Sequence, residues 1–486
     1  MPSRVVRVRS RGNRPWGQAP AGAGLREGVD AIRAELGVTA EFPPDVEAAA
    51  AAAAAAPRLP ELDRTDLELR TIDPDGAMDL DQALHLARSG AGFVVHYAIA
   101  DVAAFVTPDD PIDLEARRRG QTLYGADSKV PLHPKVISED AGSLLPEQTR
   151  PALLWTITLD ARGEQTAAKV ERALVRSRSR HSYDEVQADL DAGRADGVFT
   201  LLREIGELRM RLEAERGGVS LPLPEQEVSV SDDDHWELAF RSMHPVEEWN
   251  AQISLLTGMA AADLMVYGRV GLLRTLPPAD PRDVTRLHRT ARALKISWPA
   301  EQTYPDFIRT LDPAVPTHAA MLVACTRLLR GSGYVGFDGE LPAQPEHTAV
   351  AAEYAHVTAP LRRLIDRYAS EICVALCAGE PVPQWVLDRL ADLPEVMATS
   401  SRTASRYENA IVDLVEATAL ADRVGERFTA VVVEVEEKSA TRGEVTIAEP
   451  AIEARVSSER ELPLGEEVEV TLTSADPVAR KVAFTY

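Results

Sequence analysis

The chain has 486 residues, which is too long for one ordinary hydrophobic core and predicts two or three domains. With 45% hydrophobic and 27% charged residues it has the composition of a soluble globular protein, and no run of about 18 apolar residues predicts a membrane span. The net charge of −23 argues against nucleic acid as a partner unless basic residues are gathered locally.

Basic residues do gather in places. Only six of the 53 are Lys; the others are Arg, the side chain suited to bidentate phosphate contacts. Clusters lie at Arg117–Arg119, between Lys169 and Arg180, and at Arg362, Arg363 and Arg367. Two interpretations remain open: an acidic exterior with basic interior channels, or Arg-rich helix faces that pair with Glu.

The N-terminal segment carries five Arg in its first 14 residues and no apolar stretch, which excludes a secretory signal. An Arg-rich, acid-poor start is compatible with an organellar transit peptide, a short basic arm or disorder. Residues 15–24, rich in Gly, Pro and Ala, predict a flexible arm. Helices are expected over residues 25–36 and 46–56, and the nine consecutive alanines of the second predict a spacer helix that buries little.

The three cysteines are Cys325, Cys373 and Cys377. Their odd number, without the spacing of a zinc site, indicates buried thiols in a reducing compartment, which we take to be the cytoplasm. Cys373 and Cys377 are four residues apart on an apolar helix, a spacing that favours core packing over metal binding.

The stretch 71–83 places four acidic residues within nine positions: Asp73, Asp75, Asp79 and Asp81. Pro74 and Gly76 mark a turn between two extended segments. Within the second segment Asp79 and Asp81 alternate with Leu80, so both carboxylates are expected on one face. Carboxylates held together on a buried face need a cation or a shared proton, and Mg²⁺ is the natural oxygen-binding cation. A solvated acidic loop is the alternative.

The remaining pattern alternates strands and helices before it changes near residue 427. Strands are expected over residues 67–72, 83–86, 93–102 and 153–159, and Asp101 either supports the acidic cluster or caps a turn. An amphipathic helix is predicted over residues 180–215, with Tyr183 near its start. Further helices are expected over residues 113–119, 244–268, 281–295, 316–330, 362–377, 383–390 and 394–421. Five short strands after residue 427 predict a small OB-type β-barrel, a fold that binds oligonucleotides.

A second motif occupies residues 354–368. Thr358 is a candidate N-cap and Pro360 lies in the first turn, so Arg362 and Arg363 are expected at a helix N-terminus. Such a position favours anions, so two arginines there indicate a bound phosphate; pairing with Asp366 is the alternative.

Together these stretches resemble the ribonuclease II (RNB) family of 3′-to-5′ exoribonucleases. Residues 71–83 are similar to its acidic motif, and residues 356–363 with Asp366 to its His-Phe-Thr-Ser-Pro-Ile-Arg-Arg motif. Residues 98–102 and 246–249 resemble further family segments. The resemblance implies an α+β fold with an RNB-type catalytic domain over residues 61–426, built on a mixed sheet surrounded by helices, and an OB-type RNA-binding barrel over residues 427–486. Residues 1–60, a basic arm and a small helical segment, stand where the family has cold-shock domains.

The resemblance also implies site residues. Those for Mg²⁺, which Mn²⁺ can replace, are Asp73, Asp79, Asp81 and Gln82. Gln82 replaces the family's usual fourth Asp, so one ion is expected to bind less tightly, or mainly when RNA phosphate adds charge. Asp81, Arg362 and Tyr183 are the expected catalytic residues. The expected RNA-binding residues are Tyr124, Tyr183, His356, Thr358, Arg362, Arg363 and Glu408. Leu221 lies where an aromatic clamp residue is usual.

The implied function is magnesium-dependent 3′-to-5′ hydrolysis of single-stranded RNA to 5′-mononucleotides by a two-metal mechanism, carried out by a monomer without membrane attachment. Two alternatives remain. Gln82 and Leu221 suggest an RNA-binding protein with weakened chemistry. The helical N-terminus and acidic surface suggest a metal-binding scaffold that recruits a protein partner.

Overall fold

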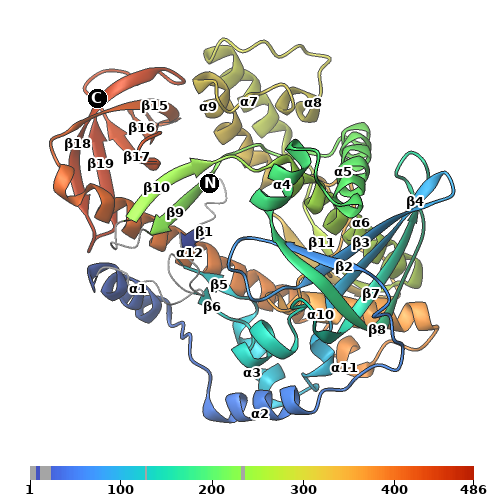
Figure 1. Cartoon of the computed structure of the whole chain (residues 1–486). Coiled ribbons are helices and arrows are strands. Elements are labelled where there is room, and N and C mark those ends of the chain that lie inside the picture. The colour runs from blue at the N-terminus through green and yellow to red at the C-terminus, as the bar shows by residue number, and fades with distance from the viewer. Residues whose placement is uncertain (1–6, 11–22, 126–128, 231–235) are drawn as a thin grey trace.

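The computed structural model describes residues 7–10, 23–125, 129–230 and 236–486. Two closed five-stranded β-barrels lie at opposite ends of the molecule, with helices between and around them (Figure 1). Most of the expected N-terminal basic and flexible arm falls outside these ranges. Within the described ranges, no helix is both long enough and apolar enough to cross a membrane.

The first barrel carries the acidic stretch. Its strands follow the order β2-β3-β4-β7-β8, antiparallel except where β2 pairs in parallel with β8 and closes the barrel. The strand bounds are β2 (Leu69–Asp73), β3 (Gln82–Ser89), β4 (Gly92–Ala100), β7 (Thr149–Leu159) and β8 (Gln165–Ser182). The expected mixed sheet with surrounding helices is confirmed, with the addition that it closes on itself.

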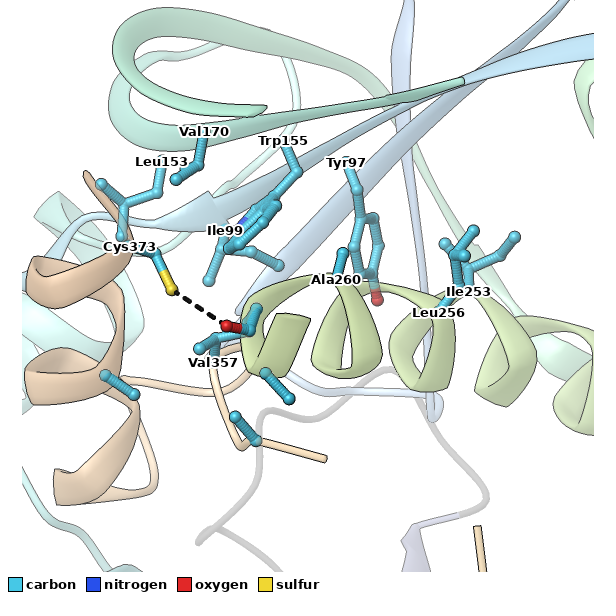
Figure 2. Close-up of a cluster of buried hydrophobic side chains, with 14 of the residues drawn as sticks. Tyr97, Ile99, Leu153, Trp155, Val170, Ile253, Leu256, Ala260, Val357 and Cys373 are labelled. Atoms are coloured by element: carbon cyan, nitrogen blue, oxygen red, sulfur yellow. Dashed lines mark hydrogen bonds between the residues drawn. The ribbon is translucent and has the colours of Figure 1, made fainter. Parts of the chain in front are cut away.

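One wall of this barrel packs against α6 (Pro245–Gly268) and α10 (Leu364–Ala378). Figure 2 shows Tyr97 of β4 and Trp155 of β7 directed towards these helices, where both are fully buried. Cys373 of α10 donates a weak hydrogen bond from Sγ to the Ala261 carbonyl oxygen, 3.8 Å away. Cys325 and Cys373 are buried and Cys377 is half-buried, and all three are free thiols, as expected for core cysteines.

The second barrel follows residue 426 and confirms the five predicted strands. Its order is β15-β16-β17-β19-β18, with one parallel pair, β17 and β19. The bounds are β15 (Arg427–Glu436), β16 (Ser439–Ile447), β17 (Ile452–Ser457), β18 (Glu467–Asp476) and β19 (Lys481–Thr485). Alternating side chains fill its core, where Phe428 and Phe484 meet edge to face at 5.7 Å. The long helix α12 (Leu393–Leu420) contacts this barrel and also the short strand β5 (Leu123–Tyr124).

The N-terminal helices α1 (Ala23–Leu36) and α2 (Pro44–Ala55) form as predicted. Helix α1 lies along α12, where Arg33 Nε donates to the Tyr407 hydroxyl at 3.3 Å. Arg119, at the end of α3 (Pro111–Arg119), donates to the carbonyl oxygens of Thr39, Glu41 and Pro131 at 3.1, 2.7 and 3.0 Å. One guanidinium therefore ties the segment after α1 to the body of the molecule.

Two helix predictions were wrong. Residues 180–215 are not one helix, because β8 continues to Ser182 and is followed by α4 (Tyr183–Asp191) and α5 (Gly197–Arg216). A capping box between Ser182 and Glu185 starts α4, and Asp196 caps α5 after Gly193 has turned the chain with φ +67°. Helix α10 begins at Leu364, so Arg362 and Arg363 precede it.

The remaining elements connect these parts. A three-stranded sheet joins β1 (Arg7–Ser10), β9 (Glu225–Val230) and β10 (Trp236–Arg241), and two-stranded sheets pair β5 (Leu123–Tyr124) with β6 (Lys129–Val130), β11 (Val270–Thr275) with β12 (Gly333–Asp338), and β13 (Glu346–His347) with β14 (Ala352–Glu353). The other helices are α7 (Pro281–Ala293), α8 (Tyr304–Ile308), α9 (Pro316–Cys325) and α11 (Gln384–Leu387). Helix α9 packs on β15, so these helices support the second barrel.

Candidate active site

The acidic stretch forms the connection between β2 and β3. Asp73 ends β2, the turn closes with a hydrogen bond from the Ala77 N–H to the Pro74 carbonyl at 3.1 Å, and Gln82 begins β3. Leu80 is fully buried in the core, which leaves Asp79 and Asp81 on the opposite side of the chain. Ser143 fixes the strand approach, because its hydroxyl accepts from the Leu80 N–H at 2.9 Å and donates to the Met78 carbonyl at 2.6 Å.

The second motif meets the first at Asp81. The Leu361 N–H donates to Asp81 Oδ1 at 2.8 Å, and Arg362 Nε lies 3.5 Å from Asp81 Oδ2. Gln82 Nε2 donates to the Thr358 carbonyl oxygen at 2.6 Å. Two segments about 280 positions apart in the sequence are thus brought together at one carboxylate.

Asp81 is buried, and Asp73 is half-buried with its Oδ2 oxygen buried. Burial, reinforced by the charge of Asp79, raises the pKa of Asp73 to about 7. Burial also raises the pKa of Asp81 to about 8, although Arg362 opposes the shift. Asp73 Oδ2 has no hydrogen-bond partner. A buried oxygen of this kind, beside further carboxylate oxygens, fits a hard cation such as Mg²⁺.

Asp79 is held by a residue that the sequence analysis missed. Lys129 Nζ lies 2.8 Å from Asp79 Oδ1 and 2.9 Å from Glu139 Oε1. With Asp79 drawn to this ammonium, no group of three His, Cys, Asp or Glu side chains converges as a ready metal site in the described ranges. The one available signal was composition, because Lys129 is one of only six lysines in an Arg-rich chain.

Tyr124 is brought to the site by the β5–β6 hairpin. Residues 120–122 run beside 362–364, with hydrogen bonds from the Thr122 N–H to the Arg362 carbonyl at 2.9 Å and from the Leu364 N–H to the Gly120 carbonyl at 3.0 Å. Burial raises the pKa of the Tyr124 hydroxyl, and the nearby Arg362 guanidinium partly opposes that shift. Tyr124 is also the direct cross-strand partner of Lys129.

Tyr183 is the first residue of α4, and Asn250 Nδ2 of α6 donates to its hydroxyl at 3.3 Å. Burial raises the pKa of Tyr97 in β4, and the charges of Tyr183, Asp73 and Asp81 add to that shift. Tyr97 shares a hydrogen bond of 2.9 Å with the Ser254 hydroxyl. Sequence reasoning did not single out Tyr97 or Asn250, although Asn250 directly follows a segment that resembles the family.

The two neighbouring arginines have different surroundings. Arg363 makes two hydrogen bonds of 2.9 Å to Asp366, whose Oδ1 also accepts from the Ala359 N–H at 2.7 Å. The alternative of pairing with Asp366 therefore describes Arg363, while Arg362 faces Asp81 with 42% of its side chain exposed. His356 is half-buried and shares a hydrogen bond of 2.7 Å between Nδ1 and the Tyr334 hydroxyl.

Other candidates take structural roles. Asp101 caps a short 3₁₀ turn by accepting from the Ala103 N–H at 3.1 Å, and it pairs with Arg172 at 2.9 Å. Arg118 and Arg119 both pair with Glu115, at 2.5 and 2.7 Å. These arginines of the clusters therefore pair with acidic residues, whereas Arg178 and Arg180 donate to the main-chain carbonyl oxygens of Thr65 and Ala77.

Glu408 and Leu221 have surroundings of their own. Burial in α12 raises the pKa of Glu408 to about 7, but no hydrogen bond or ion pair in the described part of the chain links it to Asp81 or Arg362. Leu221 packs with the hydrophobic cluster of α7, α8 and α9. A cavity of about 590 Å³ between α3, the β5–β6 hairpin and α12 contains none of the acidic motif residues.

Family models match most of the chain. The model described as RNB domain matches residues 62–378, and the model described as RNase II-type exonuclease C-terminal S1 domain matches residues 426–486.

The curated relatives share about a quarter of their residues with this chain over the matched regions. The chain is 27% identical over 359 residues to the exosome complex exonuclease RRP44 homolog A of Arabidopsis thaliana, covering 70% of this chain and 37% of that protein. It is also 27% identical over 321 residues to ribonuclease R of Escherichia coli (strain K12), covering 63% of this chain and 39% of that protein. The chain thus spans less than half the length of these two relatives.

Solved structures share the fold. Mycoplasma genitalium RNase R in complex with ribose methylated single-stranded RNA has a TM-score of 0.84 at 19% identity, covering 95% of this chain and 78% of that one. Yeast Ssd1, a pseudonuclease, has a TM-score of 0.71 at 16% identity, covering 89% and 55%. Because the RNB model alone matches well over half of the sequence, the chain belongs to the RNB family and carries an RNase II-type C-terminal S1 domain.

Proposed function

We propose that this protein is a magnesium-dependent 3′-to-5′ exoribonuclease that hydrolyses single-stranded RNA to 5′-mononucleotides. The observation that carries the proposal is the meeting of the two motifs at Asp81, where the Leu361 N–H and the Arg362 guanidinium face its two oxygens. Support for the reaction class comes from the curated relatives, one of which is named an exonuclease and the other a ribonuclease.

The residues that would hold Mg²⁺ are Asp73, Asp79, Asp81 and Gln82. Gln82 can serve as a neutral ligand, because its Nε2 donates to Thr358 and leaves the Oε1 oxygen for a cation. Mg²⁺ held there would supply a Lewis acid that lowers the pKa of water and neutralises charge on phosphate oxygens.

The protein's own groups would bind and orient the RNA. Arg362, the more exposed of the two arginines, is suited to neutralise charge that develops on the scissile phosphate, and loss of one such donor typically lowers the rate about 100- to 1000-fold. Stacking on Tyr124 and Tyr183, at roughly 1–3 kcal/mol per base, would accept any base. Contacts to the 2′-hydroxyl would favour RNA over DNA.

The test uses a 5′-labelled single-stranded RNA with Mg²⁺ or EDTA, and compares the wild-type protein with Asp81→Asn. We expect metal-dependent shortening from the 3′ end to a short limit product, and an Asp81→Asn variant that binds the RNA without cutting it. Asp75→Asn is the matched control, because Asp75 lies exposed in the same loop and should retain activity. Intact RNA with wild-type protein in both Mg²⁺ and Mn²⁺ would end the enzyme proposal.

That last outcome would favour the second candidate, an RNA-binding protein with weakened chemistry. The specific observation behind it is the ion pair between Asp79 and Lys129, which leaves fewer carboxylates for metal. The similar fold of Ssd1, named a pseudonuclease, is compatible with this reading. Tight RNA binding that EDTA leaves unchanged would support it.

A further inference from the structure

Lys129 occupies the place of a cation beside the acidic motif. Its ammonium lies between two carboxylates, 2.8 Å from Asp79 and 2.9 Å from Glu139, and the three side chains are only 13%, 16% and 21% exposed. Burial alone would lower the pKa of Lys129, but the two carboxylates raise it above its ordinary value. The two ion pairs therefore hold a positive charge at this position.

The three motif aspartates are not equally available to a metal ion. Asp73 has an oxygen without any partner, and Asp81 receives one N–H and lies at the edge of contact with Arg362. Asp79 alone has a full positive charge at 2.8 Å. A divalent ion that binds Asp79 Oδ1 must therefore displace Lys129, and one that binds Oδ2 must overcome repulsion from the ammonium on the same carboxylate.

We propose that Lys129 is an internal competitor for divalent metal at Asp79, and that Glu139 is the carboxylate that retains the ammonium when metal binds. The inference rests on the proposed function, because it concerns the metal site of that reaction, and it adds a regulating pair of residues outside the acidic motif.

Glu139 explains how the exchange can occur. A buried ammonium that simply lost Asp79 would be left without a counter-charge, which is strongly unfavourable. Because Glu139 already contacts Nζ, Lys129 can leave Asp79 and remain paired, and its flexible four-carbon stem allows the movement. Asp79 and Glu139 thus act in opposite directions on metal affinity.

The experiment measures Mn²⁺ binding to the full-length protein without RNA, by calorimetric titration. Lys129→Met should bind Mn²⁺ about tenfold more tightly, because a competing unit charge at contact distance is removed. Glu139→Gln should bind severalfold more weakly, because the ammonium then depends on Asp79 alone. Lys135→Met is the matched control, since Lys135 is exposed on the same segment and its loss changes the net charge equally.

Opposite shifts in the two variants distinguish competition from a structural role, since damage to the hairpin would weaken binding in both. In an Asp79→Asn background, Lys129→Met should have no further effect. Unchanged or weaker binding in Lys129→Met, or in Lys129→Gln if the first variant does not fold, overturns the proposal. Failure of the metal-site proposal itself would look different, with no Mn²⁺ bound by the wild type or by any variant.

Discussion

Gln82 and Thr358 are joined by a hydrogen bond of 2.6 Å from the side-chain amide of the first to the main-chain carbonyl of the second. This contact links the start of β3 to the segment that delivers Arg362. The family resemblance leads one to read Gln82 as a missing charge, but here it is also a donor that an acid could not replace.

A Gln82→Glu variant should expose this role. The substitution keeps the length of the side chain and turns a donor into an acceptor that faces a carbonyl oxygen. We expect the unfolding free energy in EDTA to fall by about 1–3 kcal/mol, measured by urea denaturation, because the partner is left unsatisfied. Mg²⁺ should reduce the loss, because a cation neutralises the new carboxylate. Equal stability of the two proteins in EDTA would show that the hydrogen bond contributes nothing.

The neighbouring arginines should separate into a structural and a functional residue. Asp366→Asn weakens the buried double hydrogen bond with Arg363, and loss of a buried ion-pair partner typically costs about 3–5 kcal/mol of stability. Arg362→Ala should unfold at nearly the wild-type urea concentration and yet degrade RNA about 100- to 1000-fold more slowly. The reverse pattern, an unstable Arg362→Ala and a stable Asp366→Asn, would contradict this division.

Acid should destabilise the fold through His133. Burial lowers the pKa of this histidine from 6.5 to about 3, so between these values the unfolded chain binds a proton that the folded chain does not. Stability therefore falls as the pH drops below 6.5, by about 2 kcal/mol at pH 5 for this residue. His133→Gln keeps a side-chain donor for the Pro360 main chain and does not titrate. Between pH 7 and pH 5, its free energy of unfolding in urea should therefore fall by about 2 kcal/mol less than that of the wild type.

The acidic motif should give the opposite pH dependence when metal is removed. Asp73 and Asp81 keep their protons in the folded state up to about pH 7 and 8, whereas the unfolded chain loses them near 3.8. The folded state thus binds more protons between these values, and in EDTA the stability contributed by these groups falls as the pH rises through 8.

Adding Mg²⁺ should raise the melting temperature more at pH 8.5 than at pH 6, because at the lower pH the ion must displace protons. Thermal unfolding in EDTA and in Mg²⁺ at both pH values measures this difference. An Asp81→Asn variant should show a smaller difference, and an equal Mg²⁺ shift at both pH values in the wild type would contradict the expectation.

The sequence predicted the parts of the fold that depend on local pattern. Alternation after residue 427 indicated the second barrel, and most of the expected helices form close to their predicted ranges. The single helix expected over residues 180–215 was wrong, because the chain there forms the end of a long strand and then two helices. The capping box of Ser182 and Glu185 starts the first helix, and the turn at Gly193 with the Asp196 cap separates it from the second.

The site was predictable where its residues are adjacent in the sequence, and not where the tertiary fold supplies the partner. Asp81 and Arg362 were identified from their motifs. Lys129 was not, because its contact with Asp79 depends on the register of the β5–β6 hairpin, which nothing local specifies. The role of Arg363 was likewise settled by where α10 begins.

The guanidinium of Arg119 has a practical consequence for shortening this chain. It holds the carbonyl oxygens of Thr39 and Glu41 on one side and that of Pro131 on the other, and Pro131 lies two residues beyond Lys129. A fragment that starts near residue 61, where the RNB match begins, would remove two of these three acceptors. Such a fragment would keep every motif residue and yet lose two of the hydrogen bonds that fix Arg119, whose third bond holds the chain next to the Tyr124–Lys129 strand pair. Shortened versions of this protein should therefore retain the peptide that follows α1.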